Sequence, residues 1–220
     1  MTFPIAVLIS GKGSNLHAIL DAIAKGSCRA TVCCVISDRE SAVGLQLAQS
    51  RGIPTRVVKP KDHANREQWD AALADAAAAF NPALVVFAGF MRIVGNIMIN
   101  RFHPRLINVH PSILPLFPGT NASEQALSAG VRVSGCSVHM VDSGVDTGPI
   151  IAQAVVPVLH GDDVGRLQQR IQRAEHRLLP AVIDAIARGS IVLGPTGCTV
   201  PHTVDDGAVL FSPRFFGEVP

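Results

Sequence analysis

Short apolar runs alternate with amphipathic helical patterns along the first half of the chain, and this alternation limits the possible folds more than any other feature. The run at 5–10 predicts a buried strand, and residues 15–24 place four aliphatic side chains on one face of a helix. The pattern continues with expected strands at 32–37, 55–58, 84–88 and 106–110, and with helices at 42–51, 65–80 and 94–101. Repeated β-α-β units with short connections favour a doubly wound, mainly parallel sheet.

The second half of the chain changes character. Long strands are expected at 133–141 and 150–158, and the turn-forming residues between them allow antiparallel pairing at the far side of the sheet. One long helix follows at 162–187, which Pro180 is expected to interrupt. We therefore expect a single α/β domain at 1–195, with an antiparallel strand towards the C-terminal half, and a tail at 196–220 whose order the sequence does not predict.

The composition argues against several classes of protein. With 220 residues, 48% of them hydrophobic, the chain can bury the core of a globular domain. A net charge of +2 without a basic run argues against nucleic acid as a partner. No apolar stretch approaches the length of a membrane span, so no membrane partner is expected. The five cysteines lack metal-ligand spacing, which predicts a reducing compartment, and we expect a cytoplasmic protein without a metal site.

Three loops are expected to meet at one edge of the sheet. Ligands of doubly wound sheets bind at the carboxyl ends of the strands, and the loops at 10–15, 89–94 and 108–119 each follow or end a predicted strand. The apolar side chains at 89–94 could form the wall of a pocket, although such a cluster more often belongs to the core.

Asn108 and His110 mark the carboxyl end of the strand at 106–110. Because side chains alternate across a strand, both point to the same side, where an amide and an imidazole could polarise a carbonyl and move a proton. A lone Asn-x-His pair is also typical of an ordinary strand end. Asp146, in the loop after 133–141, could orient the ring of His110 and favour its charged form, or simply stabilise a turn, as could Asp142.

The loop at 10–15 joins the first predicted strand to the first helix. Its glycines allow a ligand to approach the backbone, and the helix N-terminus offers free N–H groups, so the loop predicts an anion site, most naturally for phosphate. It matches neither the GxGxxG nor the Walker A pattern, and a tight turn with a serine cap explains it equally well. Lys12 could be a solvated charge.

Three further polar residues leave alternatives open. His139 is expected to pack within its strand, and a metal triad of His110, His139 and Asp146 has no support from ligand spacing. Gln172 and Glu175 share a face of the long helix and could bind a cationic group or an amine. Their spacing alone favours a solvated helix face.

Five segments, in order, resemble the phosphoribosylglycinamide formyltransferases, which are folate-dependent enzymes of purine synthesis. The segments are VLISGKGSN at 7–15, VVFAGFMRIV at 85–94, LINVHPSILPLFPG at 106–119, GCSVHMVDSGVDTGPII at 135–151 and RIQRAEHRLLP at 170–180. The similarity spans roughly residues 4–195. It implies a Rossmann-like formyltransferase fold and a monomer or homodimer.

The resemblance also implies an activity and its residues. A formyl group would pass from 10-formyltetrahydrofolate directly to the amine of 5-phosphoribosylglycinamide through a tetrahedral intermediate, without a metal. The catalytic residues would be Asn108, His110 and Asp146. The ribonucleotide would be bound by Gly13, Ser14, Asn15, Gln172, Arg173, Ala174 and Glu175. The folate would be bound by Arg66, Met91, Arg92, Ile93, Val94, Asn108, Asp142, Ser143, Gly144, Val145 and Asp146.

The chain departs from the family pattern near the loop at 111–122. Asn121 and Ser123 stand where many members have histidines, and Leu116 stands where a basic or small residue is frequent. These differences concern substrate contacts made by the loop and leave the proposed catalytic residues intact.

Two related enzymes and one other class of protein compete with this interpretation. Methionyl-tRNA formyltransferases carry an additional C-terminal domain and formyltetrahydrofolate hydrolases an additional N-terminal one, so a length of 220 residues favours the small transformylase. A non-catalytic nucleotide-binding module is the alternative from another class. The joint presence of Asn108, His110 and Asp146 argues against it.

Overall fold

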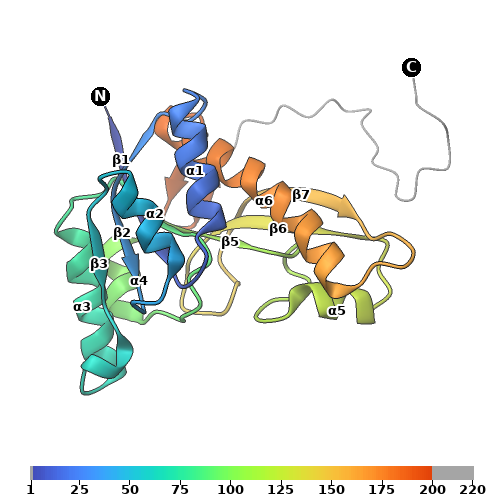
Figure 1. Ribbon diagram of the computed structural model, residues 1–220, viewed down its shortest axis with the longest axis horizontal. Coiled ribbons are helices and arrows are strands. Elements are labelled where there is room, and N and C mark those ends of the chain that lie inside the picture. Colours follow the sequence, from blue (N-terminus) through green and yellow to red (C-terminus); the bar gives the residue numbers. More distant parts are fainter. Residues whose placement is uncertain (1, 200–220) are drawn as a thin grey trace.

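The computed structural model describes residues 2–199 and is built on a seven-stranded sheet of order β3-β2-β1-β4-β5-β6-β7 (Figure 1). The strands are β1 (Phe3–Ile9), β2 (Ala30–Ser37), β3 (Thr55–Val57), β4 (Leu84–Phe87), β5 (Leu106–His110), β6 (Val133–Met140) and β7 (Ile150–Pro157). The α-helices are α1 (Ser14–Ala24), α2 (Val43–Ser50), α3 (Arg66–Ala78), α4 (Asn96–Phe102), α5 (Ala122–Ser128) and α6 (Val164–Ala187). A 3-10 turn, η1 (Pro60–Asp62), precedes α3, and a hairpin of β8 (Val192–Gly194) and β9 (Gly197–Thr199) follows α6.

The first five strands run parallel to one another, whereas β6 is antiparallel to both of its neighbours, β5 and β7. This confirms the predicted fold class, including the antiparallel strand towards the C-terminal half. The strand order reverses at β1, which lies between β2 and β4. Such a reversal leaves a crevice at the carboxyl ends of the two central strands, because the helices that follow them cover opposite faces of the sheet.

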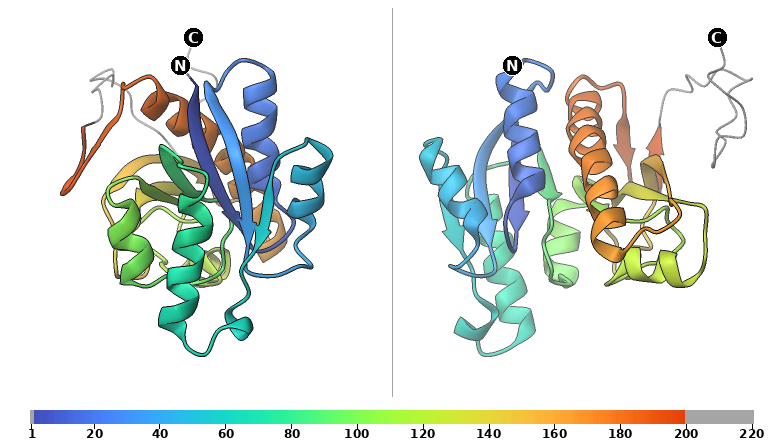
Figure 2. Two further views of the ribbon diagram at one scale, coloured as in Figure 1. Left: turned by 90° about the vertical axis from the view of Figure 1, so that its left-hand side faces the viewer. Right: turned by 45° about the vertical axis from the view of Figure 1, so that its right-hand side comes forward.

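Both faces of the central strands are buried, which explains why their sequences are continuously apolar. In β1, Ile5, Val7 and Ile9 pack in a core formed with α1, α2 and α6. The alternate side chains, Ala6 and Leu8, belong to a second core formed with α3 and α4. Figure 2 shows α1 and α2 on one side of the sheet and α3 and α4 on the other.

The structure differs from the sequence-based expectations in the C-terminal half. Pro180 does not interrupt the long helix, because α6 runs from Val164 to Ala187 with the proline inside it. The predicted boundary between residues 195 and 196 falls in the turn between β8 and β9, so the first residues of the expected tail form a strand. The remainder of that tail, 200–220, lies outside the described residues. Helix α5 and the β8–β9 hairpin were not predicted.

Candidate active site

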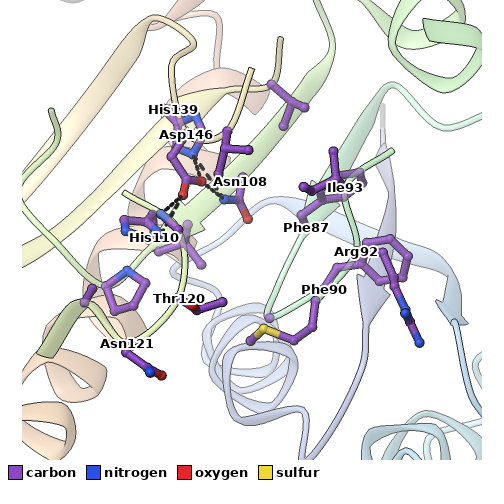
Figure 3. A pocket seen from close by; sticks show the side chains of 18 of the residues that line it. Phe87, Phe90, Arg92, Ile93, Asn108, His110, Thr120, Asn121, His139 and Asp146 are labelled. Atoms are coloured by element: carbon purple, nitrogen blue, oxygen red, sulfur yellow. Dashed lines mark hydrogen bonds and ion pairs between the residues drawn. The ribbon is translucent and has the colours of Figure 1, made fainter. Parts of the chain in front are cut away.

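The carboxyl ends of β4 and β5 border a cavity of about 570 Å³. Its walls come from the loop at 89–94, the end of β5, the segment at 119–124 and the loop that follows β6. Figure 3 shows apolar side chains, including Phe87, Phe90 and Ile93, on one side and a polar cluster on the other. The predicted meeting of the 89–94 and 108–119 loops is therefore present.

Asp146 is the centre of the polar cluster. Its Oδ2 lies 3.2 Å from Nδ1 of His110, and its Oδ1 lies 3.4 Å from both Nε2 of His139 and Nδ2 of Asn108 (Figure 3). The backbone N–H of Gly119 also donates to Oδ2, at 2.9 Å. Asp146 has a left-handed backbone (φ 55°), a conformation that non-glycine residues seldom adopt. The structure thus brings together the three residues predicted to be catalytic.

Burial and hydrogen bonding act in opposite directions on the carboxyl group of Asp146. Burial alone would raise its pKa, but hydrogen bonds from His139 and the Gly119 N–H, together with the charge of His110, lower it below its ordinary value. The side chain therefore stays anionic at neutral pH and can hold a cationic imidazole beside it.

His110 is buried, and both of its ring nitrogens face acceptors. Nε2 lies 2.8 Å from the carbonyl oxygen of Phe117. Because a carbonyl oxygen only accepts, Nε2 carries a hydrogen and donates it. The proton that can come and go is therefore on Nδ1, the nitrogen next to Asp146. Phe117 itself has a left-handed backbone (φ 57°), which belongs to the loop conformation that presents its carbonyl to His110.

His139 lies directly opposite Asn108 in the antiparallel pair of β5 and β6. Its Nδ1 donates to the carbonyl oxygen of Met140 at 2.8 Å. In the neutral ring, Nε2 then accepts from Nδ2 of Asn108 at 3.1 Å, whereas in the charged ring it donates to Asp146. His139 is buried in its strand, as expected, and it also belongs to the polar cluster, which the sequence did not predict.

A second cavity, of about 350 Å³, adjoins the first and contains the predicted phosphate loop. The two cavities share several lining residues, among them Gly89, Met91 and Gln168. Gly13 has φ 74°, and a Cβ there would lie 2.8 Å from Cα of Gly44, so only glycine fits this turn. The turn leads directly into the N-terminus of α1.

Helix α6 closes this second cavity with Gln172 and Glu175. Nε2 of Gln172 donates to Oγ of Ser14 at 3.0 Å, and Nδ2 of Asn15 donates to Glu175 at 3.1 Å. Oδ1 of Asn15 is buried and, within residues 2–199, has no hydrogen-bond partner, so a ligand could donate to it. Glu175 is only 7% exposed, and burial raises its pKa to about 7. The solvated helix face favoured by spacing alone is therefore wrong for Glu175.

Comparison with known proteins identifies the family. The sequence profile of the formyl transferase family matches residues 4–183. A phosphoribosylglycinamide formyltransferase of Mycobacterium tuberculosis is 48% identical over 193 residues, which are 87% of this chain and 89% of that protein. The chain belongs to the phosphoribosylglycinamide formyltransferase family.

Solved structures support the same family. A glycinamide ribonucleotide transformylase from Symbiobacterium toebii superposes with a TM-score of 0.87 at 46% identity, covering 90% of this chain and 94% of that one. The chain also matches a trifunctional purine biosynthetic protein of Bos taurus at 44% identity, over 88% of its own length. It spans only about a fifth (19%) of that much longer relative.

The structure brings only some of the predicted binding residues of the formyltransferase into the two cavities. Arg173, Ala174 and Ser143 line neither cavity. Arg66 lies outside the first cavity and donates to the carbonyl oxygen of Ile93 on its rim. Asp142 lines the cavity but also accepts from the Gly144 N–H and the Thr147 hydroxyl. The other predicted residues line one cavity or the other: Gly13, Ser14, Asn15, Gln172, Glu175, Met91, Arg92, Ile93, Val94, Gly144 and Val145.

Sequence reasoning missed three contributors to the site. They are His139, the carbonyl of Phe117 and the N–H of Gly119. The two backbone groups have no sequence signal, because any residue provides them. His139 could have been found only from the register of β6 against β5, which a single sequence does not reveal.

Among residues 2–199, no cluster of His, Cys, Asp or Glu could hold a metal ion, and no helix could cross a membrane.

Proposed function

We propose that this formyltransferase passes the formyl group of 10-formyltetrahydrofolate to the amine of 5-phosphoribosylglycinamide, giving formyl-phosphoribosylglycinamide and tetrahydrofolate. One observation carries the proposal: Asn108, His110 and Asp146 form a hydrogen-bonded cluster on the wall of a cavity that adjoins the glycine-rich loop of a second one. A reaction between two substrates needs two adjoining pockets with the acid–base groups at hand.

The first cavity suits the flat ring system of a folate. Its volume of about 570 Å³ lies within the range of small-molecule sites, and its walls are mainly apolar. Phe87, Phe90 and Val94 are buried in the wall, whereas Met91 and Ile93 are exposed on the rim. A planar heterocycle could pack against the buried side chains while its reactive end faces Asp146.

In the proposed reaction, the substrate amine attacks the formyl carbon. A C–N bond forms, and the electron pair of the C=O bond moves onto the formyl oxygen. Nδ2 of Asn108, once one of its hydrogens turns from His139 to the substrate, and the positive charge of the His110 imidazolium stabilise this oxyanion. Asp146 contributes by holding the imidazolium and by remaining anionic itself.

Proton transfer completes the reaction. The attacking nitrogen loses a proton, the oxyanion reforms the C=O bond, and the C–N10 bond breaks as N10 takes up a proton. Nδ1 of the His110 imidazolium can give its proton to N10, directly or through a water, and can then take up the proton lost by the attacking nitrogen, because Nε2 is committed to the carbonyl of Phe117. No covalent enzyme intermediate is needed, so no acyl-enzyme is expected.

A formyl-transfer assay tests the proposal. The purified protein, 5-phosphoribosylglycinamide and a 10-formyl folate should give the formylated ribonucleotide and the deformylated folate in equal amounts. Release of formate without the formylated ribonucleotide would instead assign a hydrolase. Unimpaired turnover by His110→Ala would disprove the mechanism. The remaining expectations, small-molecule substrates alone, a monomer or homodimer and a cytoplasmic location, stay predictions.

A further inference from the structure

A buried carboxylate with two arginines lies between the two cavities. Asp38 follows β2, and its side chain has no exposed surface. Nε and Nη2 of Arg39 donate to its two oxygens at 3.1 and 2.9 Å, and Nε of Arg92 donates to Oδ2 at 2.8 Å. Neither Asp38 nor Arg39 has a part in the mechanism described above.

The charges in this cluster do not cancel. One carboxylate faces two guanidinium groups, so the cluster carries a net charge of +1 while Asp38 is ionised. Burial would raise the pKa of Asp38, but hydrogen bonds from Arg39, Arg92 and Ser10 lower it below its ordinary value. The carboxylate therefore remains charged at neutral pH, and the surplus positive charge is permanent.

The two arginines of the cluster line different cavities. Arg39 lines the second cavity together with the glycine-rich loop, whereas Arg92 lines the first. Ser10 connects the cluster to the glycine-rich loop and to the loop at 89–94. It directly precedes Gly11, and its Oγ accepts from the N–H of Met91 at 2.8 Å. The paired contact with Asp38 uses two of the five N–H groups of Arg39, which leaves three donors for a ligand.

We propose that Arg39 binds the phosphate of the ribonucleotide and that Asp38 positions it. This inference rests on the proposed function for the identity of the phosphate. The guanidinium matches a phosphate in geometry, and its fixed position removes much of the entropy lost when a long side chain is immobilised. Lys12 lines the same cavity, but within residues 2–199 no hydrogen bond or ion pair fixes its exposed ammonium group.

Binding of ribose 5-phosphate tests the inference without the transfer reaction. Calorimetry should show that Arg39→Gln weakens this binding about tenfold or more, the effect of losing a charge-assisted hydrogen bond. Lys12→Gln removes the same charge from the same cavity and should weaken binding much less. In the transfer assay, Arg39→Gln should raise KM for the ribonucleotide by a similar factor and leave kcat and KM for the folate nearly unchanged.

The positioning role of Asp38 has its own signature. Asp38→Asn should also raise KM for the ribonucleotide, because Arg39 is no longer fixed, although the variant increases the net positive charge of the cluster. That larger charge should make ribose 5-phosphate binding weaken more steeply with increasing salt than in the wild type. Arg101→Gln breaks an arginine–aspartate pair on the surface, with Asp75, and serves as the control for stability and binding.

Two results would overturn the inference. One is ribose 5-phosphate binding by Arg39→Gln that equals that of the wild type. The other is a wild type that binds ribose 5-phosphate no better than ribose. Failure of the wild type to transfer a formyl group would refute the proposed function alone, since the binding measurements would still decide the role of Arg39.

Discussion

Asp146 is a single carboxylate that faces four polar groups, and each of its contacts restricts the others. Oδ2 faces His110 and the Gly119 N–H, so the ring of His110 cannot turn without losing an ion pair. Oδ1 faces His139 and Asn108, which fixes the amide whose Nδ2 would meet the formyl oxygen. Removing the charge of Asp146 should therefore disturb both groups that are proposed to stabilise the oxyanion.

We expect Asp146→Asn to fold and to lower kcat by about 10²–10⁴-fold, the range contributed by a positioned acid–base group. The amide has nearly the shape of the carboxylate but cannot hold an imidazolium. Steady-state assays with both substrates would measure the effect. Asp142→Asn is the matched control in the same loop, because an amide oxygen still accepts from Thr147. Asp142 lines the first cavity, so its variant should change KM for the folate rather than kcat. Equal losses in the two variants would contradict the assigned role.

The burial of Glu175 should make the free energy of unfolding depend on pH. Burial raises its pKa to about 7, above the ordinary value for an unfolded chain, so the folded state binds more protons between those two values. Stability contributed by this group is complete below about pH 4.3 and is lost as the pH rises towards 7. Relative to Glu175→Gln, the wild type should lose up to about 3 kcal/mol between pH 4 and 8.

Urea unfolding of both proteins across this pH range would measure the difference attributed to Glu175. Glu67→Gln, at an exposed position of α3, should follow the wild-type curve. Wild-type and Glu175→Gln curves that run parallel would show that Glu175 keeps its ordinary pKa.

At the scale of elements, the sequence predicts best those strands and helices whose burial dictates their composition. Strands β1, β2, β4 and β5 are continuous apolar runs because both of their faces are covered, so their positions were predicted to within about two residues. Helix α5 has only seven residues, with polar side chains among them, and its N-cap Asn121 is left-handed. Such a short helix is stabilised by tertiary packing rather than by local propensity, and it left no readable pattern.

The site was predictable where residues lie close in sequence and not where they meet across the sheet. Asn108 and His110 follow from the alternation along β5. The contact between Asn15 and Glu175 joins residues 160 positions apart, and it exists because α6 packs beside α1. The spacing of Gln172 and Glu175 could not reveal that Glu175 faces inward.

Ser137 holds the loop between β5 and α5, and its removal should affect both stability and activity. Oγ of Ser137, on β6, donates to the carbonyl oxygen of Ser112 and accepts from the N–H of Leu114, so it holds the loop that presents Phe117 to His110. Ser137→Ala leaves buried groups without partners and should destabilise the protein by about 1–3 kcal/mol. It should also lower kcat, because the carbonyl that orients His110 would lose its fixed position.

Ser134→Ala provides a control for Ser137→Ala on the same strand. The hydroxyl of Ser134 is equally buried, but within the described residues it has no hydrogen-bond partner, so its removal should cost little or stabilise the protein. Chemical denaturation and steady-state kinetics on both variants would separate the hydrogen-bond effect from the loss of a buried oxygen. Similar losses in both would contradict the role given to Ser137.

At the scale of the whole molecule, the topology places the two proposed substrates side by side. The order reversal at β1 sets the proposed phosphate loop, after β1, next to the loop that follows β4. The neighbouring β5 then pairs with antiparallel β6, which brings His139 opposite Asn108. Holding two reactants in this way can supply about 7–11 kcal/mol of the barrier reduction in the best-oriented cases.

The chain beyond the sheet provides the last prediction. All the residues assigned to the site lie within 2–199, and β9 pairs with β8 beside Ile150 of β7. We therefore expect a chain that ends at residue 199 to keep the wild-type kcat. A chain that ends at residue 195 lacks β9 and should lose a few degrees in Tm while its kcat stays close to the wild-type value, because the hairpin touches neither cavity. Scanning calorimetry and steady-state assays would measure both, and a loss of kcat in the longer chain would assign residues 200–220 a part in the reaction.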